Sequence, residues 1–263
     1  MKTFNTTAVC IPEKHYMVDI ADKVQQITGL VDAGKYFTIN RARQYGKTTT
    51  ITELAHSLAG KYTVLSLDFQ GISAAGYATE GDFIQSISRK ILDKVEFSSF
   101  QIPEKIIDEF NGFRAADAKT LRLDELQRAF RRWIAVSEKP VVLIIDEVDS
   151  ASNNQVFLDF LAQLRDGYIS RDTEGIPAFH SVILAGVTDI KHLKSSIRSE
   201  SEHKENSPWN IATDFNVDMS LSESGIKLML DEYEADNATG IDSSYMAKEI
   251  RAYTNGYPFL VSR

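Results

Sequence analysis

Residues 35–58 read KYFTINRARQYGKTTTITELAHSL. The first part, residues 36–39, is aromatic and β-branched, which is typical of a strand. Beyond a short basic loop, apolar residues recur at helical spacing: Ile51, Leu54, Ala55 and Leu58. Gly46-Lys47-Thr48 lies at the junction. The sequence therefore predicts a strand, a loop and a helix that begins at this Gly-Lys-Thr.

A strand, a loop and a helix that starts with Gly-Lys-Thr form a phosphate-binding arrangement. Backbone N–H groups and the positive end of the helix dipole attract phosphate oxygens, and the Lys47 ammonium adds a full positive charge. The Thr48 hydroxyl is a ligand for Mg²⁺ in the same arrangement. The residues that we expect around a bound ATP or ADP are Arg43, Gln44, Tyr45, Gly46, Lys47, Thr48 and Thr49.

The loop departs from the usual pattern at Arg41. The pattern G-x-x-x-x-G-K-[ST] has its first glycine at this position. One interpretation is that the turn tolerates a side chain. Another is that Arg41 and Arg43 add positive charge near the phosphates, and a third is that they are simply a solvated pair.

Composition and charge limit the alternatives. The chain has 263 residues, 43% of them hydrophobic, and a formal net charge of -8, so the surface as a whole does not indicate nucleic-acid binding. Cys10 is the single cysteine, which excludes a disulfide or a cysteine metal cluster within the chain. No apolar run reaches the roughly 18 residues of a membrane span, and the first residues lack a signal-peptide core. We expect a cytoplasmic protein.

A second motif follows about a hundred residues later. Residues 141–150 read VVLIIDEVDS, and the five apolar residues predict a strand buried on both faces of a parallel sheet. Asp146 and Glu147 then fall at its C-terminal end, the edge where ligands bind in open α/β sheets. Thr48 and Asp146 would hold Mg²⁺, and Glu147 would polarise a water for attack. The alternative is an ordinary strand end followed by a solvated turn.

Strands and helices alternate through most of the chain, which predicts a mainly parallel sheet with helices on both faces. Predicted strands are residues 36–39, 63–71, 141–145, 181–185 and an edge strand at 209–220; predicted helices are 15–34, 80–95, 123–136, 153–167, 222–236 and 243–254. Residues 96–120 are expected to be irregular, with a short helix at 103–110. We expect a nucleotide-binding domain at 1–220 and a helical lid that starts at 221–263 and continues beyond the chain.

Several stretches together resemble the AAA-like ATPase domains of bacterial proteins, which are related to the AAA+ and STAND groups: NRARQYGKTTT, VVLIIDEVDS, SVILAGVTDI, NSPWNIATDFNVDM and TNGYPFLVSR. The resemblance implies a P-loop NTPase of the ASCE type with five strands in the order 5-1-4-3-2. It also implies that Thr188 senses the γ-phosphate, with Asp189 as a rival and a helix N-cap as the plain alternative. In STAND proteins a G-x-P element packs its proline near the base, which would place Tyr257 and Pro258 at the nucleotide. A helix stop followed by a new helix start explains the same residues.

The function that these features favour is Mg²⁺-dependent ATP hydrolysis that drives a conformational change. The alternative is a nucleotide-gated module that holds ADP with little turnover and acts on a protein or nucleic-acid partner. A small-molecule kinase is less favoured because Glu147 beside Asp146 suits the activation of a water molecule. GTP is less favoured than ATP because the sequence contains no N-K-x-D string that would recognise guanine.

The exposed face of residues 123–136 carries Arg128, Arg131 and Arg132. These arginines would either contact nucleic acid or a partner or form a solvated face. Residues 16–18 would either cover the base or pack on the domain. No convincing trans-acting arginine emerges from the candidates Arg165, Arg171 and Arg198, so assembly into a ring is not supported.

Overall fold

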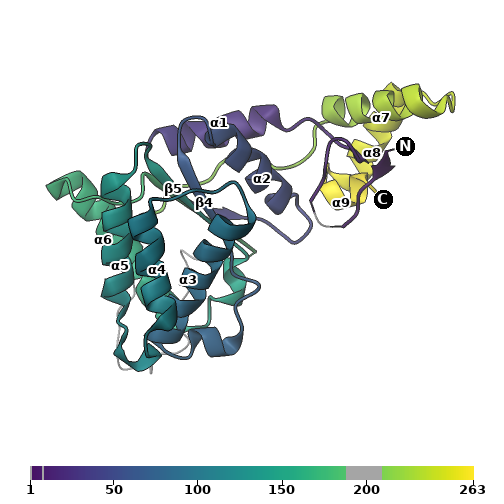
Figure 1. The fold of residues 1–263 in the computed structure, drawn as a ribbon. Coiled ribbons are helices and arrows are strands. Elements are labelled where there is room, and N and C mark those ends of the chain that lie inside the picture. The colour runs from purple at the N-terminus through teal and green to yellow at the C-terminus, as the bar shows by residue number, and fades with distance from the viewer. Residues whose placement is uncertain (1, 8, 188–208) are drawn as a thin grey trace, which may run out of the picture. The chain divides into compact units, whose positions relative to one another are not determined.

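The computed structural model describes residues 2–7, 9–187 and 209–263 (Figure 1). These residues form two compact units, each built from separate stretches of chain. The loop unit comprises Met1–Leu30, Arg41–Ser57 and Asn216–Arg263, and the sheet unit comprises Val31–Asn40 and Leu58–Phe215. The predicted boundary between a domain at 1–220 and a lid at 221–263 stays a prediction.

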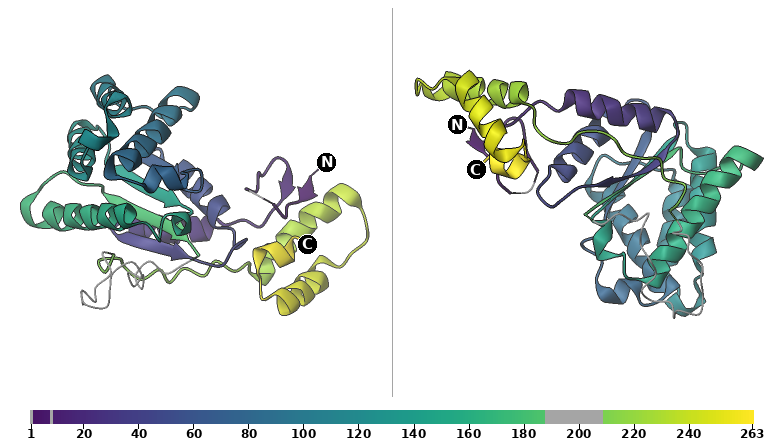
Figure 2. Two further views of the ribbon diagram at one scale, coloured as in Figure 1. Left: turned by 90° about the horizontal axis from the view of Figure 1, so that it is seen from below. Right: turned by 180° about the vertical axis from the view of Figure 1, so that it is seen from behind.

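The sheet unit is built on four parallel strands (Figures 1 and 2): β3 Tyr36–Asn40, β4 Thr63–Asp68, β5 Val141–Asp146 and β6 Ser181–Gly186. Their order is β3-β6-β5-β4. Every residue of β5 and β6 is buried, as their apolar sequences predict for strands covered on both faces. The α/β class and the parallel sheet are therefore confirmed.

The predicted fifth strand at residues 209–220 is wrong, and with it the five-strand order 5-1-4-3-2. Within the described part of this segment, pairing is limited to one parallel bridge between Thr213 and Phe37 of β3. Trp209 explains why the chain turns here. Its indole is fully buried, its Nε1 donates to Thr38 Oγ1 at 3.1 Å, and its ring stacks on Tyr36 at 5.9 Å. The bulky anchor fixes a turn, and a continuous ladder does not form.

Helices of the sheet unit pack with the strands into one apolar core. They are η1 Ala74–Tyr77, α3 Glu80–Phe97, α4 Glu104–Ala115, η2 Ala118–Thr120, α5 Leu123–Val136, η3 Val148–Ser150 and α6 Gln155–Glu174. Residues 96–120 are more ordered than predicted, because Ile106 and Phe110 of α4 are buried in this core. α6 also runs past its predicted end at Gly167 and stops at Gly175, whose φ of +70° suits a glycine C-cap.

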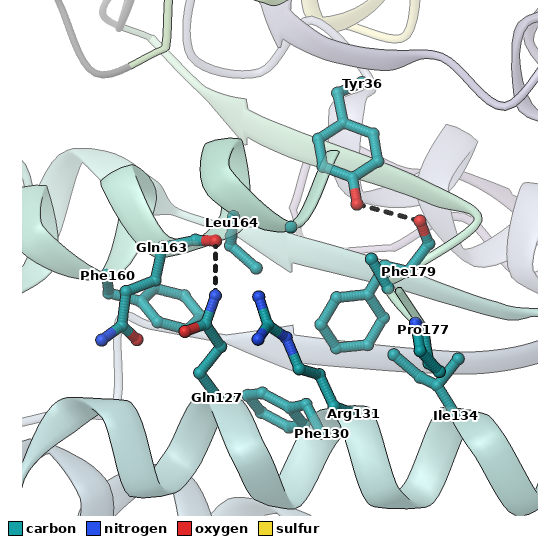
Figure 3. A pocket seen from close by; sticks show the side chains of 12 residues that line it. Tyr36, Gln127, Phe130, Arg131, Ile134, Phe160, Gln163, Leu164, Pro177 and Phe179 are labelled. Atoms are coloured by element: carbon teal, nitrogen blue, oxygen red, sulfur yellow. Dashed lines mark hydrogen bonds between the residues drawn. The ribbon is translucent and has the colours of Figure 1, made fainter. Parts of the chain in front are cut away.

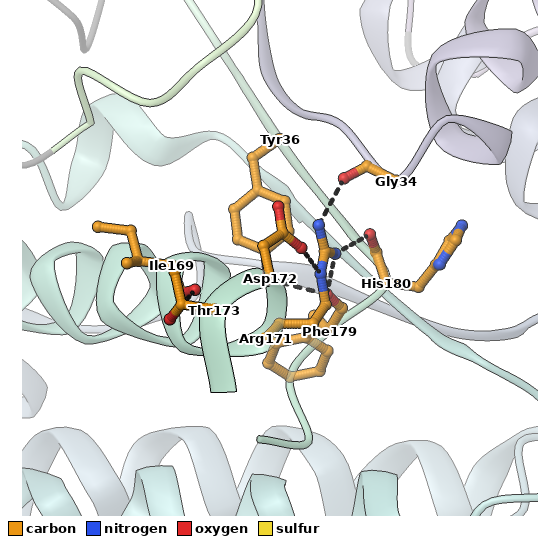
Figure 4. Close-up of polar contacts among 8 residues, drawn as sticks. All are labelled: Gly34, Tyr36, Ile169, Arg171, Asp172, Thr173, Phe179 and His180. Atoms are coloured by element: carbon orange, nitrogen blue, oxygen red, sulfur yellow. Dashed lines mark hydrogen bonds and ion pairs between the residues drawn. The ribbon is translucent and has the colours of Figure 1, made fainter. Parts of the chain in front are cut away.

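One arginine joins chain segments at the N-terminal edge of the sheet, where β3 and β6 begin (Figure 4). Arg171 of α6 donates from Nη1 to the carbonyls of Phe179 at 3.0 Å and His180 at 2.7 Å, and from Nη2 to the carbonyl of Gly34 at 3.2 Å. Its guanidinium also lies 5.7 Å from the ring centroid of Tyr36. Arg171 thus joins the chain segments that lead into β3 and β6, and it acts as a structural residue.

The loop unit combines both ends of the chain with the phosphate loop. Its elements are β1 Thr3–Phe4, β2 His15–Tyr16, α1 Ala21–Asp32, whose last residues belong to the sheet unit, α2 Lys47–Leu58, α7 Glu223–Asn237, α8 Ser243–Thr254 and α9 Pro258–Val261. Side chains cap the first turns of α7 and α8, since Ser222 accepts from Gly225 N and Asp242 accepts from Ser244 N. α1 starts later than predicted, at Ala21.

The first residues of the chain are part of this unit's core. The predicted strands begin only at residue 36, yet here β1 and β2 pair in parallel. Tyr16 is buried, packs against Phe4 and Tyr233, and donates from its hydroxyl to Asp236 at 3.0 Å. Both Tyr233 and Asp236 belong to α7. The N-terminal segment and the C-terminal helices therefore share one apolar cluster.

Candidate functional site

The phosphate loop has the predicted local structure. Residues 41–46 connect β3 to α2, and α2 begins at Lys47. In this loop the left-handed backbone angles fall on Gln44, with φ of +60°, and on Gly46, with φ of +77°. Arg41 has no positive φ, so a side chain at this position costs no backbone strain. This is the physical reason why the loop dispenses with the first glycine.

Lys47 turns back over the loop. Its side chain is 6% exposed, and Nζ donates to the carbonyl of Arg41 at 2.8 Å and to that of Ala42 at 3.1 Å. The next two residues differ in exposure: Thr48 is exposed, whereas Thr49 is half-buried and its Oγ1 accepts from Cys10 N at 3.1 Å. The ammonium thus binds carbonyl oxygens of the loop, and these oxygens would compete with a bound phosphate for its charge.

The C-terminal turn lies against the loop. The Tyr257 hydroxyl donates to the carbonyl of Arg43, and the rings of Tyr257 and Tyr45 are 5.1 Å apart. Pro258 Cγ lies 3.9 Å from the point where a Cβ on Gly46 would be. The structure therefore brings Tyr257 and Pro258, predicted from the G-x-P resemblance, next to the predicted loop residues.

An open pocket lies beside Gly46 in the loop unit. Its empty volume, including the open mouth, is about 520 Å³. The lining is mainly apolar and comes from all three stretches of the unit: Cys10, Tyr16, Met17, Val18, Ile20, Lys23, Tyr45, Gly46, Thr49, Thr50, Met219, Leu221, Met229, Pro258 and Ser262. A concave apolar site with a few polar groups is the usual form of a small-molecule site.

Sequence reasoning missed half of this lining. It raised residues 16–18 as a possible cover for a base but had no means to select Lys23, Met219 or Leu221. Lys23 is half-buried, burial lowers its pKa, and its Nζ donates to the carbonyl of Ser220 at 2.5 Å. A lysine in a helical pattern looks solvated in the sequence, and only the fold shows that it lines a pocket.

The second motif lies at the C-terminal edge of the sheet unit. Asp146 is the last residue of β5 and is 7% exposed. Glu147 follows with a left-handed φ of +55°, and its N–H donates to Asp146 Oδ1 at 2.9 Å. A non-glycine residue in this region is uncommon and is often found at functional sites. Asp68, the last residue of β4, is in register with Asp146 and adds a second carboxylate at this edge.

Asp149 is a further residue that sequence reasoning did not single out. Its Oδ2 accepts from Val187 N at 2.5 Å, directly after β6. A Cβ on Gly186 would lie 2.7 Å from the same oxygen, so glycine is required for this approach. Asp149 therefore sets the position of the chain one residue before Thr188. Thr188 and Asp189 themselves lie outside the described residues.

The structure also describes most of the other arginines that the sequence singled out. The three arginines of α5 each pair within the chain, Arg128 with Asp124, Arg131 with Asp166 and Arg132 with Glu109. This arrangement favours the solvated-face interpretation. Of the three arginines considered as trans-acting, Arg171 is structural, Arg198 lies outside the described residues, and Arg165 has a buried Nε without a hydrogen-bond partner.

A small pocket between α5 and α6 is not part of the candidate site (Figure 3). Arg131 projects into it from α5, and Gln127 Nε2 donates to the carbonyl of Gln163 at 3.1 Å. Tyr36 and Phe179 also line it. These two residues lie at the start of β3 and just before β6, so this pocket is at the N-terminal edge of the sheet, opposite the edge with Asp146.

Comparison with known proteins gives a fold and no family. No protein-family model matches the chain, and no curated protein matches it. The solved structures that are similar over 98% of this chain include the Walker-type ATPase paby2304 of Pyrococcus abyssi, with a TM-score of 0.60 and 13% identity, and Cdc6p of Pyrobaculum aerophilum, with a TM-score of 0.56 and 15% identity. This chain spans 69% of the first protein and 62% of the second.

These similarities establish that the chain has the fold of a Walker-type ATPase. The loop residues and the Tyr257-Pro258 turn lie together in the loop unit, and Asp146 and Glu147 lie together in the sheet unit. The pairing of Thr48 with Asp146 around one metal ion stays a prediction. Within the described ranges, no helix has the length and apolar character needed to cross a membrane.

Proposed function

We propose that this chain binds ATP at the phosphate loop and hydrolyses it with Mg²⁺. The observation that carries the proposal is the start of α2 at Lys47, after a loop whose left-handed turns are at Gln44 and Gly46, in a chain with a Walker-type ATPase fold. Such a helix start presents backbone N–H groups and a positive dipole end to an anion. The Lys47 ammonium would bind the oxygens of the β- and γ-phosphates.

The proposed metal ligands are Thr48 and Asp146. Their hydroxyl and carboxylate oxygens are the hard donors that Mg²⁺ prefers, usually together with water and phosphate oxygens. A Mg²⁺ ion held by these residues would neutralise the negative charge that develops on the phosphate oxygens in the reaction. Asp146 also accepts a hydrogen bond from Glu147 N, which fixes the backbone of the proposed general base beside the metal ligand.

Glu147 is the proposed catalytic carboxylate. It would accept a proton from a water molecule as the water oxygen bonds to the γ-phosphorus and the bond to the β–γ bridging oxygen breaks, giving ADP and phosphate. Thr188 is the proposed γ-phosphate sensor. Asp149 accepts a hydrogen bond from the N–H of the preceding residue, Val187, at the end of β6.

Adenine is the base that we assign to the pocket beside Gly46. Met17 and Val18 line it from the N-terminal segment, and Pro258 lines it from the C-terminal turn. The flat aromatic faces of a base gain from burial between such side chains, and Pro258 is the residue that the G-x-P resemblance would place near the base. The absence of an N-K-x-D string in the sequence argues against guanine.

A nucleotide-gated switch with little turnover is the second candidate. The contacts of Tyr257 with Arg43 and Tyr45 favour it, because they connect the loop directly to the C-terminal helices. The same proposal includes a STAND relationship, a bacterial origin, a cytoplasmic location and a partner that is either a protein or a nucleic acid. The paired arginines of α5 do not favour nucleic acid at that face.

Two substitutions test the proposal. Lys47→Ala should abolish Mg·ATP binding, measured by titration calorimetry, because it removes the ammonium that faces the phosphates. The matched control is Lys105→Ala, which removes an exposed lysine of α4 and should bind as the unaltered chain does. Retained affinity in Lys47→Ala would exclude the loop assignment.

Glu147→Gln separates hydrolysis from switching. We expect ATP to bind while steady-state phosphate release falls at least tenfold, on the order of general-base effects. Glu138→Gln, at an exposed glutamate of the sheet unit, is the control and should release phosphate at the unaltered rate. If the unaltered chain binds ATP but releases no phosphate above background, the switch is the better description.

A further inference from the structure

The Arg41 side chain reaches out of the phosphate loop. Nη2 donates to the carbonyl of Val217 at 3.0 Å. Val217 lies in the linker, residues 217–221, that leads into α7. The residue that replaces the first glycine of the motif therefore connects the loop to the chain segment that enters the C-terminal helices.

A second connection reaches the same helices from the other end. The Tyr257 hydroxyl donates to the carbonyl of Arg43, two residues after Arg41. Tyr257 is the residue before α9, in the turn at residues 256–258. The loop backbone is thus attached to the linker by one contact and to the turn by another.

The linker and the turn are themselves joined. Leu221 N donates to the carbonyl of Gly256 at 2.8 Å. Gly256 has a φ of +69°, and a Cβ there would lie 2.2 Å from the Leu221 carbonyl oxygen, so the two segments pack backbone against backbone. Leu221 is buried with Met229 of α7 and Val261 of α9. Both connections from the loop therefore lead to one joint, the contact between Leu221 and Gly256 in the core of the C-terminal helices.

Lys47 occupies the inner side of the same loop. Its ammonium donates to the carbonyls of Arg41 and Ala42. A β-phosphate would compete with these carbonyls for the ammonium, because a charge-assisted contact with phosphate is stronger than one with a neutral carbonyl. Release of the carbonyls changes the backbone at Arg41, the residue whose side chain holds Val217.

We propose that Arg41 and Tyr257 are positioning residues that couple the occupancy of the phosphate loop to helices α7–α9 through the joint of Leu221 and Gly256. This inference rests on the proposed nucleotide site and deepens it by naming its route of regulation. By thermodynamic linkage, a ligand that alters the conformation of the joint must bind with an affinity that depends on the conformation of the joint. The ligand class is a nucleoside di- or triphosphate, since a β-phosphate is needed to recruit Lys47.

Hydrogen exchange at the Leu221 amide tests the coupling, because this N–H makes the bond to Gly256. Exchange is measured in the full chain, free and with Mg·ADP at a concentration that saturates each variant. We expect ADP to change the exchange rate at least fivefold in the unaltered chain, within the usual range of allosteric coupling. In Arg41→Gly and in Tyr257→Phe the change should be at least twofold smaller than in the unaltered chain.

The variants differ in what they perturb. Arg41→Gly restores the motif glycine and removes the contact to Val217, whereas Tyr257→Phe removes one hydroxyl and keeps the ring against Tyr45. Lys248→Ala is the control: it removes an exposed positive charge of α8 that is not part of the proposed nucleotide site, so the Leu221 response should remain. Because Leu221 lines the pocket, direct protection by ADP is common to all variants at saturation, and only their difference reports coupling.

The outcomes separate the inference from the proposed function. If the unaltered chain binds ADP but Leu221 does not respond, the coupling is refuted and the nucleotide site stands. The same holds if both variants respond as the unaltered chain does, or if Lys248→Ala loses the response equally, which would indicate loss of positive charge as the cause. If the unaltered chain does not bind ADP, the proposed function fails and the inference fails with it.

Discussion

Replacement of Arg171 by methionine should destabilise the sheet unit by about 3 kcal/mol. The guanidinium donates to three carbonyls, those of Gly34, Phe179 and His180, and methionine fills a similar volume without donating to any of them. A hydrogen bond from a charged group contributes roughly 1.5 kcal/mol or more, which would give about 4–5 kcal/mol for three. The side chain is 22% exposed, so water can replace part of the loss, and about 3 kcal/mol remains.

The assay follows tryptophan fluorescence during urea unfolding. Both tryptophans, Trp133 and Trp209, are buried in the sheet unit and report its unfolding. With a slope of about 2–3 kcal/mol per molar urea, the midpoint should fall by about 1–1.5 M. Arg128→Met is the control: its partner Asp124 is an exposed neighbour on the same helix, and we expect a change below about 0.5 kcal/mol. A shift for Arg171→Met no larger than that of the control would refute the reasoning.

Further predictions concern pH and two glycines. Burial lowers the pKa of His180, so between that pKa and the ordinary value of about 6.5 the unfolded chain binds more protons, and stability falls as the pH drops from 7.5 to 5. Urea midpoints at these two pH values should differ less in His180→Gln, and an equal difference would exclude His180 as the cause. A Cβ on Gly81 would lie 1.9 Å from the Ala118 carbonyl oxygen, so Gly81→Ala should cost about 1–3 kcal/mol in the same assay. Gly112→Ala, in an open position of α4, should instead stabilise by about 0.5–1 kcal/mol, and equal effects of the two changes would contradict the packing.

The parts of the fold that sequence predicted well are those with a strong local pattern. The run at residues 141–145 is apolar at every position, and β5 is buried at every position. The spacing in residues 123–136 gave the bounds of α5, because a buried face with Leu126, Phe130 and Trp133 repeats at helical period. Motif spacing also placed Lys47 at the first position of α2.

The failures come from contacts between distant segments. The alternation at residues 209–220 resembles a strand, yet a strand needs a ladder of partners, and Trp209 uses its indole to bond Thr38 instead. α4 was underestimated because its apolar residues are few, although Ile106 and Phe110 find their partners in other helices. The pocket beside Gly46 combines three stretches of chain, so no local pattern could have identified Lys23 or Met219 in its lining.

Arg41 shows how a departure from a motif can be interpreted physically. A glycine is indispensable only where the backbone has a positive φ or where another group leaves no space for a Cβ. In this loop the positive angles belong to Gln44 and Gly46, so position 41 is free to carry a side chain. That side chain donates to the Val217 carbonyl and extends the loop's contacts to the linker before α7. This contact is the one that the proposed coupling requires of residue 41.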